Sequence, residues 1–427
     1  MEEVEEQLRK QLEKALEIKD ENPQRSMADL EAVIHSGGPD QKLTPEIIKV
    51  KEGAITSLAE LCATTGQADK LKSLLSTLRP LFVGLPKAKT AKLVRIIIDC
   101  VSRIPGTRDL QVDICREQVE WCRAEKRAFL RQRIEVRLAQ LYLDSKEFQA
   151  ALALISSLLS EVKRLDDKLL LVDIHLIESR VHHLLRNVPK AKAALTAGRT
   201  AANAVYTPPL LQADIDMQSG TLHTEEKDYK TAYSYFFEAF EAFASLKDPR
   251  AQRALKYMLL SKVMMGASDE VQNLIATKST AKLAGRELDA VAEVARAHRE
   301  RSLAHFEKAL AEYATELRGD PLVSGQTQEL YDKLLEQNLQ RITEPYSRVE
   351  VAHVAGLIGL PVDLVEARLA QMILDGKLVG TLDAGSGCLE LFDASGEDPV
   401  YTDALTVFSS LGKVVDTLFE RSRKIVA

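Results

Sequence analysis

The sequence is poor in aromatic residues, glycine and proline. Aromatic residues make up only 5% of its 427 residues, and there are 20 glycines and 14 prolines. Sheet proteins are rich in aromatic and β-branched residues and need many turns, so this composition argues against a mainly β fold. Leu and Ala are abundant, which favours long helices. At 45% hydrophobic and 28% charged residues, the chain has the composition of a globular protein with a large core or several domains.

Long apolar runs and paired cysteines are also missing. No run of 18 apolar residues occurs, so we expect no membrane-spanning segment and no membrane partner. The first residues, MEEVEEQLRKQLEKALEIKDE, are dense in charge and lack the apolar core of a signal peptide. An odd number of scattered cysteines predicts free thiols in a reducing compartment, the cytoplasm or nucleus. The five cysteines are Cys62, Cys100, Cys115, Cys122 and Cys388.

The sequence contains no catalytic or metal-binding motif. H-E-x-x-H, C-x-x-C and the phosphate-binding G-x-x-x-x-G-K-[ST] are all missing. Cys115 and Cys122 lie on one apolar helix face, which predicts core packing rather than metal binding. His298 and His305 share a helix face but lack the further convergent ligands that a metal site needs. The sequence therefore predicts no catalytic residue, no metal, no cofactor and no small-molecule substrate.

A degenerate repeat of about 40 residues runs through the middle of the chain. Residues 64–78 align with residues 144–158 at an offset of 80, and steps of about 40 lead on to two further copies. Each copy has a short polar turn (DSKE, RNVP, EEKD) between two helical patterns. A large apolar residue precedes an alanine by three positions in Phe148/Ala151, Val188/Ala191 and Tyr229/Ala232. Stacked helical hairpins of this kind bury their faces against neighbouring copies and form a solenoid.

Residues 347–392 have the layout of a winged helix. Ser347 and Glu350 match a capping box that would open a first short helix. Pro361 suits the first turn of a second helix, and Gly376 suits its C-terminal cap. One further helix is expected over residues 401–425.

Two strands are predicted after these helices, in KLVGTLD and CLELFD. Gly385 and Gly387 would supply positive φ angles in the turn between them. An open sheet edge recruits a partner strand, so Val379, Thr381 and Leu389 are candidate interface residues.

The charge of the winged helix argues against DNA binding. Residues 347–400 hold nine acids and three bases, a net charge of −6. Duplex affinity depends on Lys and Arg at the phosphates, and base readout needs donors on the second helix. We therefore predict that this module binds proteins and not DNA.

A basic stretch lies elsewhere, over residues 87–137. Its 13 bases and seven acids leave a net charge of +6. It is either a solvated helix face or a docking surface for an acidic protein partner; RNA is a weaker alternative, because few aromatic residues are interleaved. The candidate docking cations are Arg123, Lys126, Arg127 and Arg131.

Helical repeats followed by a winged helix and a terminal helix resemble the PCI-domain family. This family supplies scaffold subunits to the proteasome lid, the COP9 signalosome and a translation initiation complex. Over roughly residues 50–427 the chain is similar to a proteasome-lid member. The matching segments are EKRAFLRQ (125–132), PKAKAAL (189–195), DMQSG (216–220), DYKTAYSYFFEAFEAF (228–243), LKYMLLSKVMM (255–265), RSLAHFEKAL (301–310) and LYDKLLEQNLQRITEPYSRVEVAHVAGLIGL (330–360).

The resemblance implies an all-α solenoid of TPR-like hairpins followed by a small α/β winged helix and a C-terminal helix. The expected parts are an N-terminal helical segment (1–45), a right-handed α-solenoid (46–327, with the helical PCI part from about 220), the winged helix (328–395) and a bundle helix (400–427). The apolar residues of the last helix would be buried in a bundle with other lid subunits. Among them are Leu405, Phe408, Leu411, Val415 and Leu418.

The resemblance also implies a function. A lid member would be a non-catalytic scaffold that holds lid subunits together and clamps the lid to the ATPase ring and the core particle for ubiquitin-dependent degradation. Its expected partners are other PCI subunits, the lid deubiquitinase subunit, ATPase-ring subunits and core-particle α subunits. The alternative is a scaffold role in the COP9 signalosome or a translation initiation complex.

Overall fold

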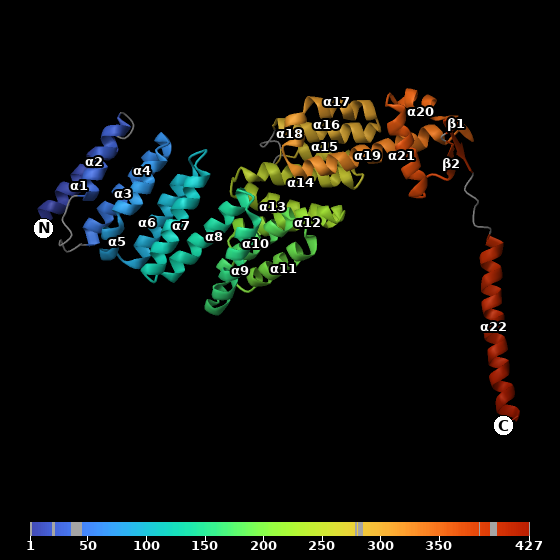
Figure 1. Ribbon diagram of the computed structural model, residues 1–427, viewed down its shortest axis with the longest axis horizontal. Coiled ribbons are helices and arrows are strands. Elements are labelled where there is room, and N and C mark those ends of the chain that lie inside the picture. The colour runs from blue at the N-terminus through green and yellow to red at the C-terminus, as the bar shows by residue number, and fades with distance from the viewer. Residues whose placement is uncertain are drawn as a thin grey trace. The chain divides into compact units, whose positions relative to one another are not determined.

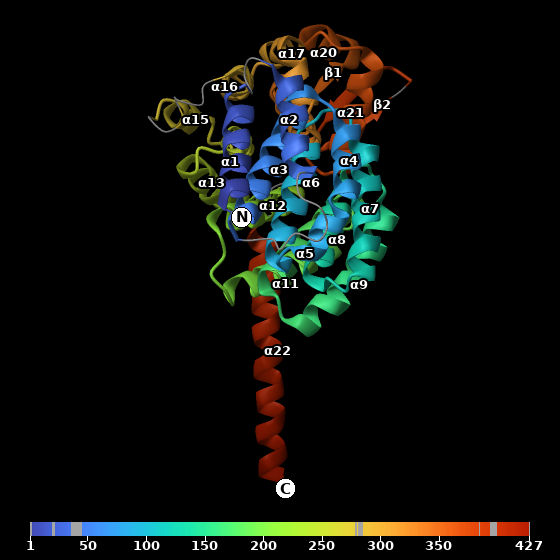
Figure 2. The same ribbon diagram turned by 90° about the vertical axis from the view of Figure 1, so that its left-hand side faces the viewer.

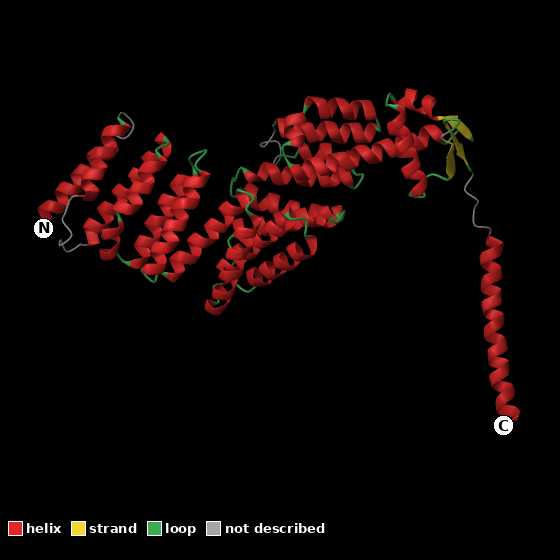
Figure 3. Cartoon of the chain, viewed as in Figure 1, coloured by secondary structure: helices red, strands yellow, loops and turns green. Residues whose placement is uncertain are grey.

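The structure is a computed structural model that describes residues 2–18, 22–35, 45–277, 280, 285–383, 385–392 and 399–426. The chain forms two compact units, Met1–Ala254 and Leu255–Ala427. The described residues contain 22 helices and three short strands, which confirms the predicted helical fold with a small winged-helix sheet (Figure 3). None of the described helices is both long and apolar enough to cross a bilayer.

The first unit is a series of antiparallel helices in which neighbours along the chain pack side by side (Figures 1 and 2). Its helices are α1 (Glu2–Glu17), α2 (Pro23–His35), α3 (Pro45–Thr65), α4 (Ala68–Thr77), α5 (Arg79–Gly84), α6 (Lys87–Ser102), α7 (Arg108–Ala124), α8 (Ala128–Asp144), α9 (Phe148–Leu165), α10 (Lys168–Leu184), α11 (Val188–Asn203), α12 (Pro209–Glu225) and α13 (Tyr229–Ser245). The boundary between the units falls within α14 (Arg250–Met264).

The predicted polar turns end their helices with one repeated backbone motif. After α8, the N–H of Lys146 donates to the carbonyl of Leu143, and the N–H of Glu147 donates to the carbonyl of Tyr142. This is the Schellman arrangement, in which the first residue beyond the cap is left-handed and is most often glycine. Here that residue is a cation with a φ between 52° and 65° in several turns. These residues are Lys126, Lys146, Arg186, Lys227 and Lys247.

The predicted alanines lie where helices approach each other. Ala151, Ala191 and Ala232 are all 0% exposed. Each stands one turn into the second helix of a hairpin, where a larger side chain would separate the pair. The repeat derived from the sequence is therefore the repeat of the structure. Cys115 and Cys122 also lie in the core, and burial raises the pKa of their thiols to about 12 and about 11.

The N-terminal helices belong to the same core as the helices that follow. Ala15 of α1 and Leu30 of α2 pack in one apolar cluster with Ile55 of α3. The buried hydroxyl of Ser26 donates to the carbonyl of Ala15 and ties α2 to α1. The sequence HSGGPDQKLTP (35–45), whose glycines and prolines make it a candidate linker, falls almost wholly on residues outside the described ranges.

The second unit contains further helices, the winged helix and the last helix, α22. Its elements after α14 are α15 (Ser268–Ile275), α16 (Arg286–Glu300), α17 (Leu303–Glu312), α18 (Ala314–Arg318), α19 (Pro321–Thr343), β1 (Arg348–Glu350), α20 (Val351–Ile358), α21 (Val362–Leu374), β2 (Gly380–Asp383), β3 (Cys388–Leu391) and α22 (Pro399–Val426). The sheet has the order β1-β3-β2, and both strand pairs are antiparallel.

The predicted capping box is wrong. Residues 348–350 form β1, and α20 begins at Val351 with Glu350 as its N-cap residue and no side-chain cap. Ser347 instead accepts a backbone hydrogen bond from Leu391, because pairing with β3 satisfies more backbone groups than a side-chain cap would.

The turn glycines follow the prediction only in part. Gly376 and Gly387 have φ angles of +69° and +65°, as expected. Gly385 does not have a positive φ; its N–H is bound by the carboxylate of Asp383, which shapes the turn instead. Within β2, a β-carbon on Gly380 would lie 2.3 Å from the carbonyl oxygen of Glu390, so this strand needs glycine there.

Candidate protein-interaction surfaces

Two cations of the basic stretch are used inside the first unit. Arg123 lies 3.1 Å from a carboxylate oxygen of Glu135, and Arg131 contacts both Glu135 and Glu161. Glu135 is nearly fully buried, and burial raises the pKa of its carboxyl despite both arginines. These contacts join α7, α8 and α9, so Arg123 and Arg131 serve the packing of the chain itself.

Arg127 is engaged in the same way. Its guanidinium donates to the carbonyl of Phe82 at 3.1 Å and lies 4.9 Å from the ring centre of Trp121. Lys126 is the left-handed turn residue after α7, and its side chain is exposed. Of the four candidate docking cations, only Lys126 is free of a packing role, which favours the solvated-face interpretation for this part of the stretch.

A groove of about 320 Å³ opens between α6, α8, α10 and α12 of the first unit. Its floor is apolar and includes the buried Ile98, Ile134 and Ile177. Its walls carry both signs of charge, with four arginines and three aspartates. The charged residues are Arg95, Asp99, Arg133, Arg137, Asp173, Arg180 and Asp214.

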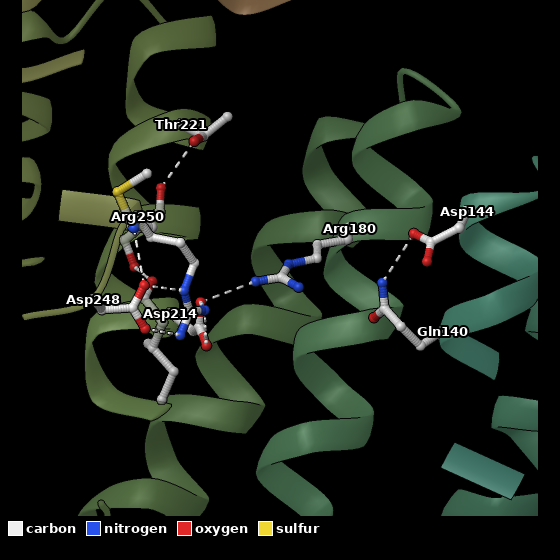
Figure 4. Close-up of polar contacts among 10 residues, drawn as sticks. Gln140, Asp144, Arg180, Asp214, Thr221, Asp248 and Arg250 are labelled. Carbon is white, nitrogen blue, oxygen red and sulfur yellow. Dashed lines mark hydrogen bonds and ion pairs between the residues drawn. The ribbon is translucent and has the colours of Figure 1, made fainter. Parts of the chain in front are cut away.

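One end of this groove is closed by a network of ion pairs (Figure 4). Both carboxylate oxygens of Asp214 on α12 accept from Arg250, at 2.8 and 3.0 Å, and Arg180 of α10 approaches from the other side at 3.5 Å. Arg250 also binds Asp248 and lies over the ring of Phe243. Asp214 is shared by arginines of two neighbouring hairpins, which fixes the spacing of these hairpins, so this network is structural.

The other end of the groove is different. Arg95 of α6 and Arg133 and Arg137 of α8 have no carboxylate within ion-pair distance among the described residues. Asp173 of α10 lies between the two ends, and burial raises the pKa of its carboxyl to about 6.

Sequence reasoning did not find this groove. It placed the three arginines in the basic stretch but singled out others, and it did not consider Asp173, Arg180 or Asp214. A signal was present, because Arg133, Asp173 and Asp214 stand at one position of the repeat, 40 and 41 residues apart.

All three bases of the winged helix are paired with carboxylates. Arg348 lies 3.6 Å from Glu390, and Arg368 and Lys377 both bind Glu336 of α19, at 3.0 and 2.6 Å. A phosphate would have to displace these pairs. The arrangement supports the prediction that this module does not bind DNA.

The three candidate residues of the sheet lie in different environments. Thr381 is exposed on β2, an edge strand, and Val379 lies just before β2 and is 51% exposed. Leu389 is on β3, the central strand, and is 0% exposed. Its assignment as an interface residue is corrected, since the third strand β1, which was not predicted, covers the side of β3 that sequence reasoning left open.

The last helix, α22, exposes nearly every described side chain. Leu405, Phe408, Leu411, Val415 and Leu418 are between 54% and 70% exposed. Apolar side chains at these positions cover about two-fifths of the helix circumference. Exposed apolar surface of this size marks an interaction site.

The described residues contain no group of three or more His, Cys, Asp or Glu side chains placed to hold a metal ion. His298 bonds to Ser268, and burial lowers the pKa of its imidazole. His305 bonds to Glu300 at 2.7 Å.

Comparison with known proteins gives two family matches. Residues 8–145 match the 26S proteasome regulatory subunit RPN6 N-terminal domain, and residues 310–393 match the PCI domain. The second match covers the end of the helical series and the winged helix, so the PCI resemblance is confirmed.

Curated relatives match over most of their length. The chain is 57% identical over 388 residues to a 26S proteasome non-ATPase regulatory subunit 11 homolog of Arabidopsis thaliana, covering 91% of this chain and 93% of that protein. It is 46% identical over 405 residues to a probable 26S proteasome regulatory subunit rpn6 of Schizosaccharomyces pombe, covering 94% and 95%. Against the 26S proteasome regulatory subunit RPN6 of Saccharomyces cerevisiae it is 43% identical, covering 87% of each chain.

Proposed function

The chain belongs to the family of 26S proteasome regulatory subunit RPN6, also called non-ATPase regulatory subunit 11, and we propose that it is a non-catalytic scaffold of the proteasome lid. In this role it holds lid subunits together and clamps the lid to the ATPase ring and the core particle. The names of the relatives favour the proteasome over the COP9 signalosome or a translation initiation complex.

The observation that carries the proposal is the exposed apolar face of α22. A helix of 28 residues with this much exposed apolar surface would promote aggregation of the free protein. Burial of each large side chain is worth roughly 1.5–3 kcal/mol, so the face can supply much of the free energy of assembly. We infer that it enters a bundle with helices of other lid subunits.

The winged helix provides a second contact. The exposed edge strand β2, with Thr381 and the neighbouring Val379, is suited to other PCI subunits. The lid deubiquitinase subunit is a further expected neighbour. The proposal assigns no reaction to this chain, since its charged clusters join helices to one another.

The first unit suits the clamping role. Its apolar core runs from α1 through α10 in one cluster, and a second cluster begins on α10 and extends to α12, so successive hairpins are joined along the unit. We propose that it carries the contacts to ATPase-ring subunits and core-particle α subunits, in the cytoplasm and the nucleus.

Gentle native purification of the tagged full chain, followed by mass spectrometry, tests the assembly. Recovery of lid, ATPase-ring and core-particle subunits is expected. Recovery of ribosomal proteins and initiation factors, or of COP9 signalosome subunits, in their place would contradict the proposal. A washing step in high salt distinguishes the contacts within the lid from the contacts to the ATPase ring and core particle. Salt weakens polar contacts more than apolar ones, so ATPase-ring and core-particle subunits should be lost before the lid subunits held by the apolar bundle.

A further inference from the structure

The open end of the groove combines cationic and apolar character. Arg133 and Arg137 are one helical turn apart on α8 and so lie on the same face, and Arg95 faces them from α6. The buried Ile98 and Ile134 form the floor between the two helices. A ligand that lies here meets guanidinium groups at its sides and hydrocarbon beneath.

The guanidinium of Arg137 is incompletely satisfied. Its Nε is buried, and no hydrogen-bond acceptor among the described residues reaches it. A buried donor without a partner costs about 1–3 kcal/mol. The Nε of Arg250, by contrast, donates to a carboxylate oxygen of Asp248 at 3.1 Å. A carboxylate brought by a ligand could bind the other nitrogens of the Arg137 guanidinium, which lines the groove.

The two ends of the groove differ in net charge, and this difference determines where a charged ligand would bind. At the closed end, Arg180 and Arg250 are balanced by Asp214 and Asp248, so that end offers little net charge. The open end has Arg95, Arg133 and Arg137 against the exposed Asp99 and the half-buried Asp173, which lies within electrostatic reach of Arg133, so the net charge of the open end is positive. Negative charge on a ligand is therefore attracted to the α6–α8 side.

We propose that this groove binds a short acidic segment of another protein, in which two carboxylates flank an apolar side chain. The apolar side chain packs on Ile98 and Ile134, and the carboxylates accept hydrogen bonds from Arg95 on one wall and from Arg133 and Arg137 on the other. A volume of about 320 Å³ is at the small end of ligand sites, which suits a short segment of three side chains rather than a larger ligand. The residues that line the groove include no aromatic ring, so bases of single-stranded RNA would have nothing to stack on.

The proposal goes beyond the scaffold role and does not depend on it. It concerns the first unit alone, and its test uses the isolated full chain. Loss of lid assembly would leave the peptide result unchanged.

A displayed library of random dodecapeptides, selected on the immobilised full chain, is the probe. The test variant carries Arg133→Gln and Arg137→Gln, and a second variant carries Arg95→Gln alone, in case the first pair disturbs the fold. The matched control carries Arg103→Gln and Arg164→Gln, two substitutions of the same kind outside the groove. Circular dichroism melting of all variants checks that each is folded.

Peptides enriched on the unmodified chain should carry at least two Asp or Glu residues beside an apolar residue. By fluorescence anisotropy, the Kd of the best peptide should rise about tenfold or more in the groove variants and stay within about twofold in the control. Replacing its acids by Asn and Gln should abolish binding. The proposal is overturned by a library without enrichment, by peptides that lack acids, by equal loss in the control, or by poly(U) RNA that competes for the same arginines.

Discussion

A β-carbon added to Gly220 would lie 2.6 Å from Cε1 of Phe236, so the backbone of α12 rests directly on this ring of α13. Phe236 is itself 0% exposed and cannot move aside without opening the core. The contact explains why the strongest helix-breaking residue after proline stands in the middle of a helix.

The first prediction follows from this contact. Gly220→Ala should lower the free energy of unfolding by about 1–3 kcal/mol, because overpacking outweighs the better helix propensity of alanine. The control is Gly325→Ala on α19, where a β-carbon meets nothing within 4 Å and a gain of up to about 1 kcal/mol is expected. Urea unfolding followed by circular dichroism measures both. A stabilising Gly220→Ala would show that the ring and the helix are less tightly packed than the structure has them.

The second prediction concerns the left-handed turns. Lys146 has a φ of 62° and an exposed side chain. A residue with a β-carbon is strained at this φ, whereas glycine is not. Lys146→Gly should therefore raise the free energy of unfolding by about 1 kcal/mol. The same change at the exposed Glu241, in the middle of α13, should lower it by a similar amount. Equal signs at the two positions would contradict the Schellman assignment.

The repeat was predictable because it leaves its mark on residue types that are close in sequence. Polar turns and alanines at the crossing points recur every 40 or 41 residues, and all three predicted alanines are buried. Whether a segment of 16–18 residues forms a helix depends largely on the spacing of its own apolar residues, so the order of the helices could be predicted from the sequence.

The errors have a different physical origin. Ser347 and Glu350 satisfy a local capping pattern, but residues 348–350 instead pair with β3, some 40 residues away. The same missing strand made Leu389 look like an edge residue. The groove escaped notice because its charges come from four helices, and only the structure tells a paired arginine such as Arg131 from an unpaired one such as Arg133.

The third prediction is a pH dependence of stability. Burial raises the pKa of Asp173 to about 6, so its ionised form is disfavoured in the folded chain. The contribution of this group to stability is fully present below about pH 4 and is lost as the pH rises through about 6. Asp173→Asn, which stays neutral, should raise the free energy of unfolding by about 1–3 kcal/mol at neutral pH and by little near pH 4.

The control for this experiment is Asp99→Asn, which removes an exposed carboxylate from the same groove. It should change stability by no more than about 0.5 kcal/mol at either pH. Thermal melting across the pH range provides the comparison. If Asp173→Asn destabilises the chain at neutral pH, its carboxylate has a favourable partner and the burial argument is incorrect.

The last prediction tests the role of α22. Its described side chains are exposed, so the helix contributes little to the stability of the rest of the chain. Removal of residues 399–427 should therefore leave the melting temperature of the isolated subunit unchanged but prevent its incorporation into reconstituted lid. Phe408→Asp with Leu411→Asp should act likewise, since losing two buried side chains and gaining two buried charges weakens assembly by about 100-fold or more. Ser409→Asp with Ser410→Asp adds the same charge to the polar face of the helix and should assemble normally. Native gels of the reconstituted lid measure incorporation, and differential scanning fluorimetry measures stability. A truncated subunit that melts earlier would mean that α22 packs on its own chain, and one that assembles normally would mean that the apolar face has another purpose.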